Sequence, residues 1–167
     1  SIDNVSTLVL SRVYHWEKTM PNREWLIQPM GGGEVSSLTF AQGMNEARRM
    51  ASHLVSLNLP PKSHIAILSK NTAHWILSDL AIWMAGHVSI PIYPTLTAQS
   101  VRQILDHSGA KLIFIGKLDG WAAMKEGVPD GMQKILLPLS AESEGLAWQS
   151  LIKDQNPVGD VHRAGDD

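Results

Sequence analysis

Hydrophobic positions in the second half of the chain follow two different periodicities. Short, almost continuous apolar runs at 64–68, 111–115 and 134–137 are typical of parallel strands that are covered on both faces. Between the first two runs, residues 72–86 and 97–109 repeat apolar side chains at helical spacing. Strands that alternate with helices predict an α/β fold with a parallel sheet flanked by helices.

The first forty residues predict an N-terminal helix followed by a β-hairpin. Helical spacing over 5–18 brings five apolar residues near one face, which we expect to be buried: Val5, Leu8, Val9, Val13 and Trp16. Two extended apolar runs, 23–30 and 34–40, flank a glycine triplet at 31–33, and this pattern is typical of a β-hairpin. The triplet does not predict a phosphate loop, because such a loop needs a following helix and a strand follows here.

A long amphipathic helix is predicted over 40–57. Thr39 and Gln42 have the spacing of a capping box, which starts a helix. Asn58 tolerates a left-handed backbone and precedes two prolines, so the helix should end there. The face expected to be buried carries Met44, Ala47, Ala51 and Leu54.

The stretch SIPIYPTLTAQSV, residues 89–101, begins as a strand that ends abruptly. Its two prolines cannot donate to a strand ladder, and they keep the residues before them extended. A rigid loop, Tyr93-Pro94-Thr95, is therefore expected before a helix that starts near Thr97. This loop is either a simple connection, with Thr95 or Thr97 as the helix N-cap, or part of a ligand site, because ligands of doubly wound sheets gather beyond the carboxyl ends of the strands.

The patterns in the sequence that indicate helices and strands become weaker after Pro138. One short helix is expected within 141–154, and the polar stretch from 156 to 167 predicts a linker or a frayed tail. Ile76, Leu80, Trp83 and Met84 form an apolar stripe at helical spacing, and Trp75 borders it, which favours a place in the core for both tryptophans. The chain is accordingly divided into an N-terminal helix and hairpin at 1–40, an α/β subdomain at 41–140, and a short helix with a polar tail at 141–167.

Composition narrows the classes of function. The chain has 167 residues and a net charge of -2, with scattered lysines and arginines, so no nucleic-acid partner is expected. The absence of cysteine removes disulfides and thiolate zinc sites and favours a cytoplasmic location. Charged residues interrupt every candidate membrane span. The seven histidines lack metal-ligand spacing, and no GxSxG motif is present, so neither a metal site nor a catalytic residue is assigned.

Three segments follow one another in a distinctive order: SKNTAHWILSDLAIWMAG, PIYPTLTAQSV and ILDHSGAKLIF. With SLTFAQGMNEARRMASHL before them and HRAGDD at the end, they resemble the N-terminal part of the AMP-forming acyl-CoA synthetases. The Tyr-Pro-Thr sequence favours the bacterial long-chain fatty acid–CoA ligases within that family. The resemblance extends over roughly residues 10–167.

The resemblance implies a reaction and its partners. Family members activate a carboxylic acid with ATP to an acyl-adenylate and then transfer the acyl group to coenzyme A. A long-chain fatty acid, ATP, Mg²⁺ and coenzyme A are thus the expected partners of the parent enzyme, with peripheral membrane contact also allowed. The resemblance also implies that Tyr93, Pro94 and Thr95 lie near the wall of the tunnel that coenzyme A enters.

The family's phosphate loop, of the form YTSGTTGxPKG, does not occur in this sequence. The resemblance therefore implies an N-terminal fragment that lacks the ATP-site residues, binds none of these cofactors tightly and is inactive alone. A departure from the family pattern is that Asn58 and Lys62-Ser63 stand where relatives usually have a glycine and then Gly-Asp. The alternatives are a fragment of a fatty acyl-AMP or aryl-acid ligase, and a noncatalytic α/β binding module.

Self-association is the first testable prediction. In relatives this sheet packs against further parts of the same chain, so the isolated chain should expose apolar surface and form a homodimer that covers it. Analytical ultracentrifugation over a dilution series, with a hydrophobic dye, measures this. A monomer at every concentration without dye binding would contradict the prediction and favour the noncatalytic module.

Overall fold

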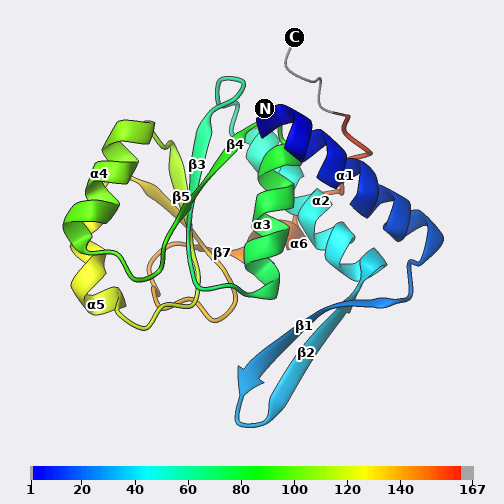
Figure 1. Cartoon of the computed structure of the whole chain (residues 1–167), viewed down its shortest axis with the longest axis horizontal. Helices are drawn as coiled ribbons and strands as arrows, with labels where there is room; N and C mark the ends of the chain where they lie inside the picture. The colour runs from blue at the N-terminus through cyan, green and yellow to red at the C-terminus, as the bar shows by residue number, and fades with distance from the viewer. Residues whose placement is uncertain (1, 163–167) are drawn as a thin grey trace.

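The computed structural model describes residues 2–162, which form a five-stranded parallel sheet, helices on both of its faces and a projecting hairpin (Figure 1). The α/β prediction, with its N-terminal helix and hairpin, is confirmed. The elements are α1 (Ile2–Thr19), β1 (Glu24–Gly31), β2 (Glu34–Thr39), α2 (Phe40–Ser56), β3 (His64–Leu68), α3 (Ala73–Met84), β4 (Val88–Ile92), α4 (Ala98–Ser108), β5 (Leu112–Ile115), α5 (Trp121–Met124), the 3-10 turn η1 (Lys125–Gly127), β6 (Gln133–Leu136), β7 (Leu146–Ala147) and α6 (Trp148–Lys153).

The strand order is β4-β3-β5-β6-β7, and every neighbouring pair is parallel. Strand β3 lies between β4 and β5, so that Ile65 is level with Ser89 on one side and Leu112 on the other. The edge strand β4 carries Pro91, whose side chain is exposed. An edge position suits proline because its missing N–H removes no hydrogen bond from a second neighbour.

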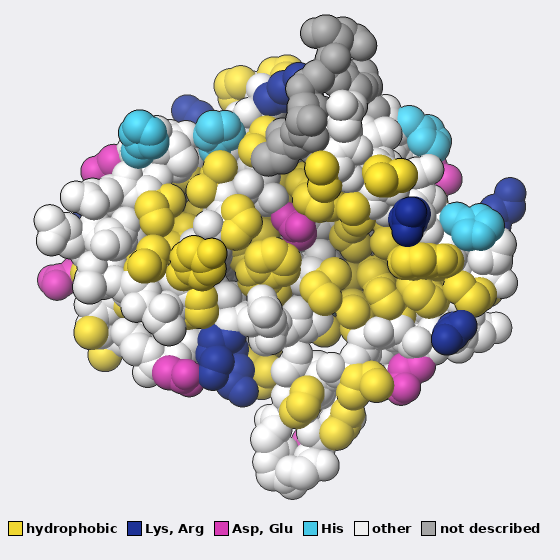
Figure 2. Space-filling view, viewed as in Figure 1, with side chains coloured by type: hydrophobic (Ala, Val, Ile, Leu, Met, Phe, Trp, Pro, Cys, Tyr) yellow, Lys and Arg dark blue, Asp and Glu magenta, His cyan; other side chains and the backbone are white. Residues whose placement is uncertain are grey.

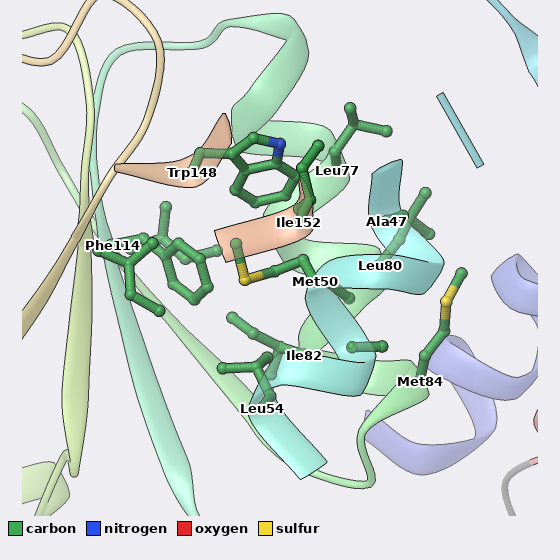
Figure 3. Packing of buried hydrophobic residues seen from close by; sticks show 14 of the residues in the cluster. Ala47, Met50, Leu54, Leu77, Leu80, Ile82, Met84, Phe114, Trp148 and Ile152 are labelled. Carbon is green, nitrogen blue, oxygen red and sulfur yellow. The ribbon is translucent and has the colours of Figure 1, made fainter. Parts of the chain in front are cut away.

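Two apolar layers hold the helices on the sheet. The layer beneath α4 and α5 includes Val101, Leu105 and Trp121. The larger layer lies between the sheet and α2, α3 and α6, where Trp148 and Phe114 are fully buried and pack with 6.1 Å between their ring centroids (Figure 3). Burying side chains of this size is the main favourable contribution to folding.

The capping box before α2 is confirmed. Thr39 Oγ1 accepts a hydrogen bond from the Gln42 N–H at 3.1 Å, and Gln42 Oε1 accepts one from the Thr39 N–H at 2.9 Å. The helix ends as predicted, since Asn58 has a left-handed φ of 54°. Lys62, which stands where relatives usually have a glycine, also has a positive φ, of 60°. The fold thus places non-glycine residues where left-handed backbone is required, at some conformational cost.

The buried face of α1 differs from the predicted one. Val13 is buried as predicted, and Val9 and Trp16 pack against the core, but Val5 and Leu8 are each 57% exposed while Ser6 and Leu10 are buried. The helix packs against both α2 and α3, and its buried face includes the small Ser6. Hydropathy does not mark a serine as a buried residue, so helical spacing identified only part of the buried face.

The tryptophans in α3 are only partly in the core. Trp75 and Trp83 are half-buried and pack against its edge, while Ile76 beside them is 41% exposed. The fully buried tryptophan is Trp148, in the short C-terminal helix. Leu80 and Met84 of the predicted stripe are thus buried in the core, whereas Ile76 and the two tryptophans lie at its margin.

The stretch after α6 is not a free linker over its described part. Arg48 on α2 pairs with Glu17 and Asp160, both at 2.6 Å, and donates to the Val158 carbonyl at 3.0 Å. The predicted linker or frayed tail is thus wrong for residues 156–162, which lie along α2. The remainder of the HRAGDD segment is outside the described residues. The polar composition of this stretch suggested a tail. The contacts of Arg48 with residues more than 100 positions away leave no signal in the local sequence.

The surface also carries apolar side chains. On the hairpin, Ile27 is 59% exposed and Val35 is 61% exposed, and Figure 2 shows hydrophobic side chains both there and across the middle of the same face. Homodimer formation stays a prediction. Among the described residues no helix has the length and apolar character needed to span a membrane.

A single carboxylate oxygen joins three helices. Glu46 Oε1 on α2 accepts hydrogen bonds from His74 Nε2 in α3 and Trp148 Nε1 in α6, both at 2.9 Å, and from Gln149 Nε2 at 3.4 Å. Burial raises the pKa of Glu46, but the bonds from His74 and Trp148 outweigh burial and hold the pKa below its ordinary value.

Replacing this carboxylate should change how stability depends on pH. A group whose pKa is lowered by folding stabilises the fold above its unfolded pKa, here near 4.5, and that contribution disappears as the pH falls through the folded value. We expect Glu46→Gln to cost about 1–2 kcal/mol at pH 7, because a charged hydrogen-bond acceptor is lost. Urea unfolding between pH 3 and pH 8 measures this, with the exposed Glu144→Gln as the matched control. Parallel profiles for wild type and Glu46→Gln would contradict the prediction.

Candidate functional site

The carboxyl ends of the parallel strands meet at one edge of the sheet. The chain leaves β3 at Ser69, β4 at Tyr93, β5 at Gly116 and β6 at Leu137. In open parallel sheets this edge is where ligands bind, because loops from several strands converge there. The predicted loop Tyr93-Pro94-Thr95 therefore lies on the edge where a site is expected.

The loop after β4 is short and stiff. Tyr93 is 77% exposed, and its carbonyl accepts a hydrogen bond from the Leu96 N–H at 3.4 Å, which closes a turn around Pro94. Thr97 then caps α4, since its Oγ1 accepts a hydrogen bond from the Ser100 N–H at 3.1 Å. Of the two N-cap candidates, Thr97 is thus the cap and Thr95 is not. The Thr95 side chain is exposed and is left for another role.

Two clefts lie on either side of Pro94, which lines both. The larger has a volume of about 440 Å³ and lies between this loop, the end of β3 and α5; it is lined by Lys70, Pro94, Thr95, Leu96, Thr97, Ala98, Asp119, Gly120, Ala123 and Met124. The smaller, of about 250 Å³, is lined by Ser69, Asn71, Trp75, Pro91, Ile92, Tyr93 and Pro94. The sequence singled out the loop that contains Pro94 but gave no indication of the two clefts that it lines.

An ion pair stands at the rim of the larger cleft. Lys70 Nζ lies 2.8 Å from Asp119 Oδ2, and the Lys70 N–H donates to the Lys117 carbonyl at 2.8 Å. The hydrogen bond and charge of Lys70 hold the pKa of Asp119 below its ordinary value, with a smaller contribution from Lys117. The sequence held no signal for this pair, because its two members are 49 residues apart and meet only when β3 and β5 become neighbours.

Close packing of the strand ends forms the floor of this edge. A Cβ atom at Gly116 would overlap the Ser69 side chain, so only glycine allows the chains leaving β5 and β3 to approach this closely. The two clefts at this edge therefore depend on the register of the strands, which sets how closely the loops approach one another.

A third hollow, of about 140 Å³, lies between the hairpin and the body of the protein. Its walls include Gln28 and Leu38 of the hairpin together with Glu46, Thr72 and His74. Gln28 Oε1 accepts a hydrogen bond from the Ala73 N–H at 2.9 Å, which ties the hairpin to the start of α3. Within the described residues, no three histidine or carboxylate side chains gather as a metal site.

Comparison with known proteins places this architecture in a family. The model of the AMP-binding enzyme family matches residues 13–163. The chain is 31% identical over 122 residues to the long-chain-fatty-acid–CoA ligase FadD15 of Mycobacterium bovis. The aligned region covers 73% of this chain and 19% of that protein. It is 28% identical over 124 residues to the fatty acid–[acyl-carrier-protein] ligase ScoC of Streptomyces coeruleorubidus, covering 74% of this chain and 23% of that one.

Solved structures share the fold. A benzoate CoA ligase from Burkholderia xenovorans LB400 superposes with a TM-score of 0.75 at 21% identity, over 93% of this chain and 30% of that chain. The chain spans about a fifth of the length of the curated relatives that it matches. With a family model that matches nearly its whole length and a parallel sheet of the same architecture, this chain belongs to the AMP-binding enzyme family of adenylate-forming ligases.

Proposed function

We propose that this chain is the N-terminal part of an ATP-dependent long-chain fatty acid–CoA ligase. The supporting observation is the 31% identity to a long-chain fatty acid ligase across 73% of the chain, within a family match over residues 13–163. The proposed parent enzyme forms an acyl-adenylate from the fatty acid and ATP with Mg²⁺, releases pyrophosphate and passes the acyl group to coenzyme A.

Two other acid ligases are the alternatives, and each has an observation in its favour. The fold neighbour that acts on benzoate supports an aryl acid as substrate. The relative named as a fatty acid–[acyl-carrier-protein] ligase supports an acceptor other than coenzyme A, as in fatty acyl-AMP ligases. The first alternative thus differs from the proposed enzyme in its acid substrate, and the second differs in the acceptor of the acyl group.

The longer enzyme tests the proposal directly. Purified protein that contains this chain is incubated with ATP, Mg²⁺ and coenzyme A, and with either palmitate or benzoate. We expect palmitoyl-CoA and AMP with palmitate, and at least about tenfold slower turnover with benzoate, a preference that corresponds to ~1.4 kcal/mol in the transition state. Faster turnover with benzoate, or adenylate without thioester, would support the respective alternative instead.

The 167-residue chain alone should not carry out the first step. Adenylation depends on positioned charges around the phosphates, and the family's YTSGTTGxPKG loop is not in this sequence. We expect no pyrophosphate above a protein-free control when the chain is mixed with ATP, Mg²⁺ and palmitate. Clear turnover by the pure chain would contradict the assignment of the ATP site to another part of the enzyme.

In the proposed enzyme, the loop Tyr93-Pro94-Thr95 forms part of the wall along which coenzyme A approaches the acyl carbonyl. The stiffness of the loop supports this role, because a wall that is already ordered needs no ordering when the substrate binds. Its exposed Thr95 lines the cleft of about 440 Å³, which is open to a ligand chain. This role predicts an effect on the second half-reaction only.

Thr95→Trp in the longer enzyme tests the loop. The bulky ring should fill the cleft and slow thioester formation about tenfold or more, equivalent to ~1.4 kcal/mol, while acyl-adenylate formation changes less than about twofold. Rapid-quench measurements separate the two half-reactions, and Thr95→Ser, which keeps the hydroxyl and adds no bulk, is the control. Equal slowing of both steps, or of neither, would mean that the loop is only a connection between strand and helix.

A further inference from the structure

The hairpin projects from the body of the protein (Figure 1), and the hollow of about 140 Å³ lies between the two. It shares no lining residue with the two clefts beside Pro94. Its walls are mixed, since Leu26 and Leu38 of the hairpin contribute apolar side chains and Glu46 of α2 contributes a carboxylate. The hollow is therefore a separate cavity with its own chemistry.

The Glu46 carboxylate uses only one of its two oxygens. The bonds from His74, Trp148 and Gln149 all end on Oε1, and within residues 2–162 no hydrogen bond reaches Oε2. Four polar side-chain atoms of the described residues are enclosed without a partner, and Oε2 is not one of them. Because Glu46 lines the hollow, Oε2 is an acceptor that a molecule in the hollow can reach.

The charge of this carboxylate is only weakly compensated. Trp148 and Gln149 donate hydrogen bonds to it but bring no charge, and His74 brings one only when it is protonated. Within the described part of the chain, no lysine or arginine pairs with Glu46. A negative group with 15% of its side chain exposed gains from a cation that approaches its open oxygen.

One wall of the hollow has an unfavourable backbone conformation. Leu139, in the loop after β6, has a φ of 71° and lines the hollow. The left-handed region is disfavoured for residues with a Cβ atom, and such residues gather at ligand sites, where the surrounding structure holds them. This conformation places another apolar residue in the wall beside the carboxylate.

The geometry selects one kind of cation. A guanidinium group pairs best with both oxygens of a carboxylate, but Oε1 of Glu46 already accepts three bonds. A primary ammonium group is compact and needs only a single oxygen. A cavity of about 150 Å³ holds a molecule as large as benzene, so this hollow suits an ammonium group on a stem of about four carbon atoms.

We propose that the hollow binds a primary ammonium group on a short aliphatic stem, with the ammonium at Glu46 Oε2 and the stem against Leu26 and Leu38. This inference does not rest on the proposed ligase function. A bound ligand contacts both the hairpin and α2, and it should therefore fasten the hairpin to the body. A two-stranded hairpin has little stability of its own, so this effect should be measurable.

The binding experiment is an NMR titration of the isotopically labelled 167-residue chain with butylammonium. The amide signals of Gln28, Glu46 and Leu139 should shift, with a dissociation constant of about 1–10 mM, because the ligand is small and makes one ionic contact. Butan-1-ol, which lacks the charge, and butyrate, which reverses it, should each bind at least about tenfold more weakly. Hydrogen exchange of the β1 and β2 amides should become slower when butylammonium is present.

Two variants, each with a matched control, make the test specific. Glu46→Gln removes the charge and should weaken butylammonium binding at least about tenfold, whereas the exposed Glu144→Gln should leave it unchanged. Ser36→Phe fills the hollow from the hairpin side and should have a similar effect without touching the carboxylate. Its control is Val35→Phe, on the opposite face of the same strand, and the spectra report whether each variant is folded.

The ammonium group can belong to a free amine or to the lysine side chain of a polypeptide, since both carry it on the same four-carbon stem. A blocked Gly-Lys-Gly peptide, titrated in parallel, distinguishes these sources. Tighter binding of the peptide than of butylammonium indicates a lysine side chain, and tighter binding of butylammonium indicates a free amine. Either result supports the site.

Several results would overturn the inference. The absence of shifts at about 100 mM butylammonium would show that the hollow does not bind this class of ligand. Equal affinity for butan-1-ol would show that the carboxylate plays no part. Unchanged affinity in folded Glu46→Gln and Ser36→Phe would place the binding elsewhere. None of these measurements involves adenylation, so the palmitate and benzoate assays can fail or succeed independently of them.

Discussion

Parallel pairing of β3 with both β4 and β5 is the constraint on which the rest of the structure depends. Parallel neighbours cannot be joined by a tight turn, so each connection must cross the sheet as a helix, and α3 and α4 are those crossovers. Both faces of β3 are covered as a result, and four of its five residues are fully buried. The same pairing sends three strand ends to one edge, where their loops form the two clefts.

The charged rim follows from that arrangement. Lys70 belongs to the loop after β3 and Asp119 to the loop after β5, and they meet because those strands are neighbours with matched register, Leu68 level with Ile115. Gly116 lets the two loops come close, and Pro94 closes the cleft from the side of β4. The shape of both clefts is thus set by the sheet and by the loops that leave it.

Local signals predicted most of the elements because they depend on neighbouring residues. The reciprocal bonds of Thr39 and Gln42, the left-handed Asn58 and the loop at Pro94 all involve residues within a few positions of one another. The errors have a different origin. The buried stripe of α1 includes Ser6 rather than Val5, and residues 156–162 lie on α2 because of Arg48. Both outcomes depend on which surface the rest of the chain presents.

By itself the sequence determined the α/β class, the order of the main helices and strands but not β7, the position of the loop at Tyr93-Pro94-Thr95 and, through its resemblance, the family. These features follow from periodicity, capping and proline geometry, which act over short distances along the chain. Only the tertiary structure decided the strand order, the two clefts beside Pro94, the Glu46 hydrogen bonds to α3 and α6, and the meeting of Lys70 with Asp119. Such contacts join residues that lie tens of positions apart, and their partners are chosen by how the elements pack rather than by any pattern near either residue.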